Sequence, residues 1–381
     1  INFLEISFPG LLDIPGFLLE FITPIIKITI TKPKREVISF YTMPEYERWR
    51  EEESHKCNWK QKYYKGLGTS SQQEAREYFS DLDKHLKIFH ALGGNDRDLI
   101  DLVFSKKKTD ERKEWLRQFE PGTHLDPELK EIPIGDFINK ELILFSLADN
   151  VRSIPSVLDG FKPGQRKVLY GCFKRNLKAE IKVAQLAGYV SEHTGYHHGE
   201  ESLVQTIVGL AQDFVGSNNI YILRPKGAFG TRAAGGKDSA APRYIFTEMN
   251  KITRIIFNPL DNPLLTYTQD DEQTVEPEWY LPVIPMLLVN GAEGIGTGWS
   301  TNIPPFNPLD IVKNLKKLMN DEEMDNMAPW YRGWTGSLEK IDAQRYKMYG
   351  RIEQLGENIL EITELPAKTW TSTVKEHLLL G

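Results

Sequence analysis

The segment from Gly227 to Phe246 places the strongest constraint on how this chain can fold. It holds four glycines and the basic residues Arg232 and Lys237, and it ends with Arg243 directly before Tyr244. Glycine has no side chain, so a loop of this kind lets the backbone approach a bulky partner closely. A tyrosine beside an arginine is also a candidate nucleophile, whose charged product the guanidinium would hold. The local sequence alone favours a plainer interpretation, a glycine-rich connection into an ordinary strand.

Length and composition set broad limits. A chain of 381 residues is too long for one core and predicts two or three domains. Its 40% apolar and 26% charged residues are typical of a globular protein. The sequence has no run of 18 apolar residues, the pattern that would indicate a membrane helix. The first residue is not Met and no signal-peptide pattern follows, so we expect a segment of a larger protein. Two distant cysteines without a zinc pattern indicate a reducing compartment.

Charge is distributed unevenly. The net charge of −6 argues weakly against a nucleic-acid binder. However, residues 151–243 contain 13 Lys and Arg against 7 Asp and Glu. A basic middle in an acidic chain is a local electrostatic footprint of the kind that nucleic acids recognise.

Sequence patterns predict the following elements. In the first third we expect strands at 25–30 and 37–41, a helix from the capping box Ser71–Glu74 toward His90, an exposed helix at 105–120, and a linker at 121–133. In the middle we expect helices at 137–148, 165–176, 184–190 and 201–215 and strands at 220–223 and 244–247, an order that fits a winged helix-turn-helix unit. Beyond it we expect a second glycine loop at 291–298, an amphipathic helix at 308–319, and strands at 349–353 and 359–364.

Six short motifs in a fixed order carry the most specific signal. They are Lys62-Tyr-Tyr-Lys-Gly-Leu-Gly68, Leu158-Asp-Gly-Phe-Lys-Pro-Gly-Gln-Arg-Lys167, Tyr196-His-His-Gly199, Phe229-Gly-Thr-Arg232, Arg243-Tyr244 and Gly291-Ala-Glu-Gly-Ile-Gly296. Each is weak by itself. Together they resemble the eukaryotic type IIA DNA topoisomerases over essentially the whole chain.

The resemblance implies a multidomain fold of α/β and α+β classes. Its parts would be the C-terminal portion of a Rossmann-like (TOPRIM) metal domain at 1–115, a linker at 116–133, a winged-helix domain at 134–283, and an incomplete tower-like α/β domain at 284–381. It also implies a homodimer that cuts both strands of duplex DNA and, in the full-length enzyme, passes a second duplex through the break in an ATP-driven cycle. A nuclear location follows from the same resemblance.

The resemblance assigns the catalytic residues. Tyr244 would attack a backbone phosphate and form a 5′-phosphotyrosine, while Arg243 would stabilise the charge. His198 would assist proton transfer or donate a hydrogen bond. For Arg243 the plainer alternative is a surface arginine on a strand.

The resemblance also implies DNA-binding residues. Arg152 and Lys162 would grip phosphates around the cut, and Arg232, His197 and Lys65 are further candidates. Ile295, between two glycines, would wedge between base pairs and bend the duplex. Plainer alternatives stay open: a generic surface lysine at Lys162, a buried histidine at His197, a strand–helix turn at Lys65, and a small hydrophobe tucked into a turn at Ile295. A further set is expected to mix backbone contacts with a solvated helix face: Arg166, Lys167, Lys174 and Arg175.

The implied cofactors are Mg²⁺ and ATP. Members of the family hold magnesium with a glutamate and an Asp-x-Asp-x-Asp run, which would lie upstream of Ile1. The acidic triplet Glu51–Glu53 has basic neighbours and indicates a solvated helix instead, so we expect no metal ligands in this chain. No Walker-type loop occurs, and ATP would serve the full-length enzyme only. Two other functions remain as alternatives, a DNA-bending module without catalysis and an RNA-binding winged helix.

Overall fold

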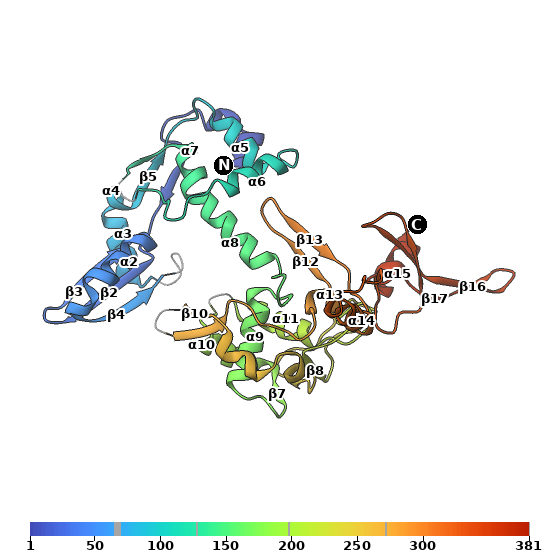
Figure 1. Cartoon of the computed structure of the whole chain (residues 1–381). Helices are drawn as coiled ribbons and strands as arrows, with labels where there is room; N and C mark the ends of the chain where they lie inside the picture. The colour runs from blue at the N-terminus through green and yellow to red at the C-terminus, as the bar shows by residue number, and fades with distance from the viewer. Residues whose placement is uncertain (65–69, 127–128, 197–198, 271–272, 381) are drawn as a thin grey trace. The chain divides into compact units, whose positions relative to one another are not determined.

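The computed structural model describes residues 1–64, 70–126, 129–196, 199–270 and 273–380. The chain divides into two compact units. Unit 1 comprises residues 1–149 and 297–299, and unit 2 comprises residues 150–296 and 300–381. Figure 1 shows the helices and strands of both units, coloured along the chain.

Unit 1 contains two small sheets. In the first, β5 pairs antiparallel with β1 and parallel with β6; in the second, β2 lies between β3 and β4, antiparallel to both. The strands are β1 (Leu19–Phe21), β2 (Ile26–Lys32), β3 (Glu36–Phe40), β4 (Asn58–Tyr63), β5 (Leu86–Phe89) and β6 (Glu131–Ile132). Successive side chains of β2 point to opposite faces of the sheet. One face carries Ile26, Ile28 and Ile30 and packs inward against Phe40 and Tyr46.

The helices of unit 1 surround these sheets. They are α1 (Asn2–Ser7), η1 (Pro9–Leu11), α2 (Met43–Glu52), η2 (Ser54–Lys56), α3 (Gln72–Ser80), α4 (Leu82–His85), α5 (Asp96–Phe104), α6 (Thr109–Arg117), α7 (Ile134–Phe137), the π-helical turn η4 (Ile138–Leu142) and the first part of α8 (Ile143–Ser153). A separate core forms where α5, α6 and the α7–η4–α8 segment meet β5 and β6. Trp299 packs against this core, and the Arg117 guanidinium lies 5.9 Å from its ring centre.

Unit 2 is built around the helices α9 (Pro163–Lys174), α10 (Val183–His193) and α11 (Glu200–Ala211). Their inward faces carry fully buried aliphatic side chains, among them Leu169, Leu186 and Leu203, each worth about 1.5–3 kcal/mol of transfer free energy. An antiparallel sheet completes this part, in the order β7 (Ile181–Lys182), β9 (Phe246–Met249), β8 (Leu223–Lys226). The three helices, the small sheet and the glycine loop agree with the element order that the sequence predicts.

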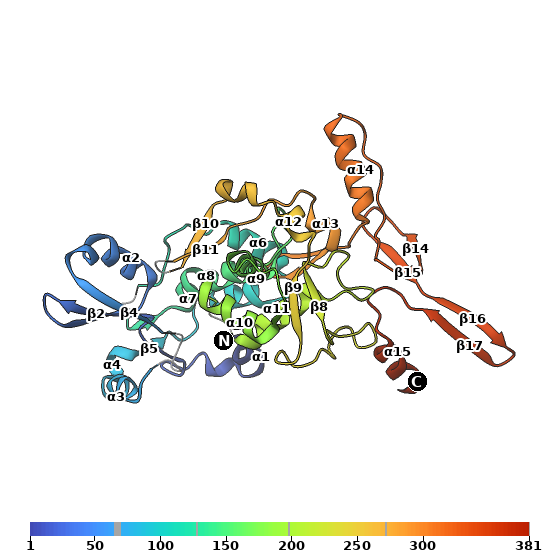
Figure 2. The same ribbon diagram turned by 90° about the horizontal axis from the view of Figure 1, so that it is seen from below.

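The remainder of unit 2 consists of short helices and antiparallel hairpins (Figure 2). Its elements are α12 (Thr253–Ile256), η5 (Pro259–Leu264), the hairpin β10 (Tyr267–Asp270) with β11 (Gln273–Pro277), α13 (Met286–Asn290), the hairpin β12 (Ala292–Ile295) with β13 (Ser300–Ile303), α14 (Pro308–Met319), the hairpin β14 (Ser337–Lys340) with β15 (Tyr346–Tyr349), the hairpin β16 (Arg351–Gly356) with β17 (Ile359–Glu364), and α15 (Thr371–Leu380).

Several local predictions are confirmed. The strands at β2, β3 and β17 and the helices at α9, α10 and α14 form where the sequence indicates them. The Ser71 capping box is present: the Glu74 backbone N–H donates to the Ser71 hydroxyl (3.3 Å), and the Ser71 N–H donates to the Glu74 carboxylate (2.8 Å). Asn307 caps α14 by accepting a hydrogen bond from the Leu309 N–H (3.0 Å).

Other local predictions are wrong in informative ways. The helix that begins at Gln72 ends at Ser80, and the residues before His90 form β5, because Lys87 and Phe89 turn inward in strand alternation. The expected linker contains β6, which pairs with β5. Half of residues 291–298 is strand β12 of a hairpin, since Ala292–Ile295 pair residue by residue with β13; the residues that follow connect the two strands.

Candidate active site

Arg243 and Tyr244 lie on a turn that the core of unit 2 fixes in place. The backbone N–H of Val183, at the start of α10, donates to the carbonyl of Ile245 (3.0 Å), whose side chain is buried. Tyr244 therefore points away from the core and is 67% exposed. The Arg243 guanidinium carbon lies 4.9 Å from the Tyr244 ring centre, so a positive charge accompanies the phenol. The turn thus presents a phenol and a cation side by side to solvent.

The glycines of the preceding loop accommodate the chain's own atoms. Gly230, Gly235 and Gly236 have φ of +102°, +62° and +81°, a region that favours glycine. A Cβ on Gly236 would lie 2.3 Å from Nε2 of Gln212, and one on Gly235 would lie 2.4 Å from Nε1 of Trp370. The sequence indicates that a bulky partner approaches the backbone of this loop. At Gly235 and Gly236 that partner is a side chain of unit 2, Trp370 or Gln212.

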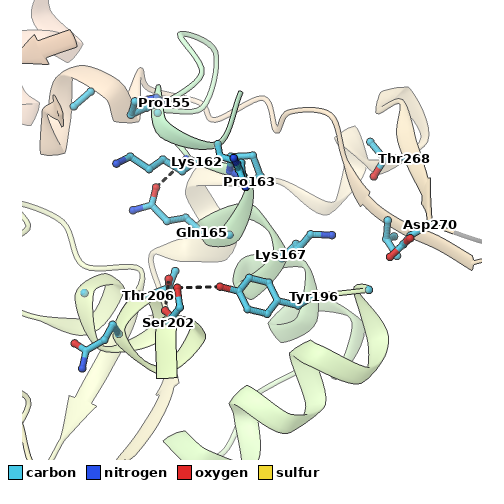
Figure 3. Close-up of a pocket in the computed structure, with 18 of the residues that line it drawn as sticks. Pro155, Lys162, Pro163, Gln165, Lys167, Tyr196, Ser202, Thr206, Thr268 and Asp270 are labelled. Carbon is cyan, nitrogen blue, oxygen red and sulfur yellow. Dashed lines mark hydrogen bonds between the residues drawn. The ribbon is translucent and has the colours of Figure 1, made fainter. Parts of the chain in front are cut away.

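A cleft of about 790 Å³ opens at the N-terminal end of α9 (Figure 3). Its wall brings together two predicted phosphate-binding residues, Arg152 and Lys162. Polar side chains face it as well, and the Tyr196 hydroxyl donates to the Ser202 hydroxyl (3.2 Å) at its floor. Other residues of the wall are Pro155, Gln165, Lys167, Gln205, Thr206, Thr268, Asp270 and Glu293. Cations beside amide and hydroxyl groups suit a phosphate backbone better than an apolar ligand.

A buried carboxylate fixes the loop that carries Lys162. Asp159 is inaccessible to solvent and accepts hydrogen bonds from Arg166 Nε (2.7 Å) and Nη2 (3.0 Å), from the Phe161 N–H (2.9 Å) and from the Tyr280 N–H (2.9 Å). Arg166 belongs to neither part of the expected mix of backbone contacts and solvated face, because its guanidinium is buried against Asp159. Lys162 follows directly at the start of α9, where its N–H donates to Gln165 Oε1 (2.9 Å).

Lys167 makes a second link that the sequence did not reveal. Its ammonium donates to Glu276 (2.9 Å) and to the Thr194 carbonyl (2.5 Å), so it joins β11 to the end of α10. The expectation of a solvated face therefore does not hold for Lys167, which is largely buried. The predicted residues His197 and His198 follow Tyr196 and lie outside the described residues, as does Lys65.

Ile295 projects from the end of β12. Residues of this strand alternate, with Ala292 and Gly294 buried and Ile295 80% exposed. The flanking glycines fit against the end of α8: a Cβ on Gly294 would lie 2.1 Å from the Ser153 carbonyl oxygen, and one on Gly296 equally close to the Asn150 side-chain oxygen. Ile295 is therefore not tucked into a turn. The backbone on either side of Ile295 packs against α8, and the Ile295 side chain lies in solvent.

A sequence model of the family formed by the A subunits of DNA gyrase and topoisomerase IV matches residues 152–380. The chain belongs to this family. A second model, the C-terminal associated domain of TOPRIM, matches residues 21–150. The resemblance to type IIA topoisomerases is thus confirmed.

Relatives agree with this assignment. The chain is 77% identical to DNA topoisomerase 2 of Saccharomyces cerevisiae over 381 residues, and 53% identical to that of Drosophila melanogaster over 391. Both matches cover all of this chain, which spans only 27% of the length of either relative. A solved structure, the DNA-binding, cleavage and re-ligation domain of Plasmodium falciparum topoisomerase II, superimposes with a TM-score of 0.79 at 50% identity, over 100% of this chain and 51% of that one.

The topoisomerase resemblance implies magnesium, which oxygen ligands from carboxylates would hold. In the part of the chain that the structure describes, no three His, Cys, Asp or Glu side chains gather as a metal site would require. The described residues therefore do not fit the ion. Nor is any described helix long and apolar enough to cross a membrane.

Arg232, predicted to bind DNA, already has partners in this member of the family. Its Nη2 donates to the Glu364 carboxylate and to the Leu365 carbonyl (3.2 Å). The side chain is 27% exposed. No sequence signal could have shown this, because 132 residues separate Arg232 from Glu364.

Proposed function

We propose that this chain is the DNA cleavage and religation core of a type II topoisomerase. The observation that carries the proposal is the exposed Tyr244 beside Arg243, on a turn bonded to α10. The phenol oxygen would form a bond to a backbone phosphorus while the bond from phosphorus to the 3′ oxygen breaks, and a proton passes to that oxygen. The reverse step restores the strand, because the phosphotyrosine retains the energy of the broken bond.

The finer architecture belongs to the same proposal. We place a TOPRIM-type metal domain at about 1–115, a winged-helix domain at 134–283 and a tower-like domain at 284–381. The two family models, which match residues 21–150 and 152–380, support the coarser division into a TOPRIM-associated part and a cleavage part. In the full-length protein, a homodimer would bind duplex DNA, use Mg²⁺ held by residues outside the described part of this chain, and use ATP to pass a second duplex. We place this activity in the nucleus.

Covalent trapping tests the proposal. The full-length protein is incubated with end-labelled duplex DNA, stopped with detergent and digested with protease. We expect labelled DNA that carries peptide on its 5′ ends at the break and a free 3′ hydroxyl. Absence of any detergent-stable adduct would favour the DNA-bending module instead.

We predict that the 381-residue chain alone binds duplex DNA in a salt-sensitive way and does not cut it. Lys and Arg contacts to phosphates release counterions, so affinity should fall by about a factor of ten or more between roughly 50 and 200 mM salt. Cutting needs a cation beside the phosphate, and the described residues gather no ligands for one. Titration at several salt concentrations and a supercoiled-plasmid assay with magnesium measure both. Tyr244-dependent cutting by this chain would contradict the prediction.

Replacing Ile295 by Ala should reduce DNA bending and lower cleavage more than binding. The side chain is an apolar surface that offsets unstacking of a base step, a cost of a few kcal/mol. Energy transfer between dyes at the ends of a short duplex reports the bend. Leu309→Ala is a matched control, because Leu309 is similarly exposed on α14. An unchanged bend angle in the Ile295 variant would count against the wedge.

A further inference from the structure

The glycine loop that leads to Tyr244 is tied to a distant segment of unit 2 through Arg232. The guanidinium donates to one carboxylate oxygen of Glu364, whose side chain is only 5% exposed. The other oxygen accepts from the N–H (3.0 Å) and the hydroxyl (2.9 Å) of Thr335. One buried carboxylate therefore joins the loop, the residues just before β14 and the end of β17.

Two further contacts run alongside this ion pair. The Ser372 N–H donates to the Ala233 carbonyl (3.0 Å), and Gly235 lies against the Trp370 ring. Burial alone would raise the pKa of Glu364, but hydrogen bonds from Arg232 and Thr335 outweigh it and lower the pKa to about 2. The carboxylate is therefore ionised at neutral pH, and the contact with Arg232 is a charged pair.

The loop is closed by its own hydrogen bonds, which join residues before Arg232 to residues after it. Asp238 accepts from the Thr231 N–H (2.8 Å) and hydroxyl (2.7 Å), and the Ala240 N–H donates to the Ala228 carbonyl (2.9 Å). Four residues after Ala240 the chain reaches Tyr244. A displacement at Arg232 would thus be transmitted through a short, internally bonded segment.

We propose that Arg232 is a positioning residue: its pair with Glu364 holds the glycine loop and so sets the place of Tyr244. This inference rests on the proposed function, because cleavage by Tyr244 is what the positioning serves. A phosphate contact by Arg232 would require the guanidinium to leave Glu364. That exchange is unfavourable because it leaves the buried Glu364 carboxylate without its cation.

The test compares Arg232→Gln, Glu364→Gln and the double variant in the full-length protein, with DNA affinity at several salt concentrations and single-turnover cleavage as readouts. We expect both single variants to lower the cleavage rate by about tenfold, and the double variant to be no worse than either, because they remove one interaction. Affinity and its salt dependence should stay as in the unmodified protein. Asp342→Asn, which removes an exposed pair with Arg345 (2.6 Å), is the matched control and should cleave normally.

The opposite pattern would overturn the inference. A phosphate contact predicts that Arg232→Gln weakens binding and lowers the salt slope by about one, while Glu364→Gln leaves cleavage intact. Additive effects of the two substitutions would also overturn it.

Hydrogen exchange separates this inference from the proposed function. Amides of residues 228–243 should exchange faster in both single variants than in the unmodified protein, without DNA and whether or not the protein cleaves. Unchanged exchange in that segment would reject the positioning role even if cleavage by Tyr244 is established.

Discussion

Replacing Tyr244 by Phe in the full-length protein is expected to abolish covalent attachment to DNA while duplex affinity stays nearly the same. The substitution removes only the hydroxyl, which is the proposed nucleophile. The exposed ring and its contact with Arg243 remain. One hydroxyl contributes about 1 kcal/mol to an interface at most, and phosphate contacts dominate such interfaces. Detergent-stable adducts and equilibrium titrations measure the two effects.

A second tyrosine supplies the control for this experiment. Tyr349→Phe removes a half-exposed hydroxyl that donates to Glu339 on the hairpin β14–β15. This variant should form adducts at the normal rate. An adduct that survives in the Tyr244 variant would show that another residue is the nucleophile.

The largest loss of stability is expected from Asp159→Ala. The variant leaves the Arg166 guanidinium buried without its anion and removes the acceptor for the Phe161 and Tyr280 N–H groups. Breaking a buried pair in this way costs about 3–5 kcal/mol. Urea unfolding of the chain, followed by a probe in unit 2, measures the change, since two units need not unfold together.

Two comparisons make the Asp159 result interpretable. Asp342→Asn removes a solvent-exposed pair and should leave the unfolding midpoint where it was. Asp159→Asn keeps an acceptor oxygen and should fall between the unmodified protein and the Ala variant. An Asp159→Ala midpoint equal to that of the unmodified protein would show that the buried pair does not stabilise the loop.

How far the sequence predicts this molecule depends on the range of the interaction involved. Helix α14 is predicted to the residue, because its apolar spacing and the Asn307 cap are local. The turn that carries Tyr244 was expected inside a strand, yet β9 begins at Phe246, because hydrogen bonds to α10 hold the preceding residues out of the sheet.

The candidate site shows the same division. Motifs alone singled out Ile295 and Tyr244, and both side chains are exposed; their roles stay predictions. The strand β12 was not predicted. A side chain at Gly294 or Gly296 would clash with the end of α8, and α8 lies far away in the sequence. For the same reason the sequence could not show the partner of Lys167, because Glu276 lies 109 residues away. Arg166 pairs with Asp159 only seven residues before it, and its burial depends on the surrounding core.

The pair between Arg232 and Glu364 limits what can serve as a minimal cleavage unit. A chain shortened to end before Glu364 would retain Tyr244, Ile295 and the whole wall of the cleft. It would nevertheless lose the anion that faces Arg232, together with the Trp370 ring that Gly235 contacts. Inactivity of such a shortened protein would therefore say little about the residues it still contains, and inhibitor or kinetic studies need a chain that extends at least through Trp370.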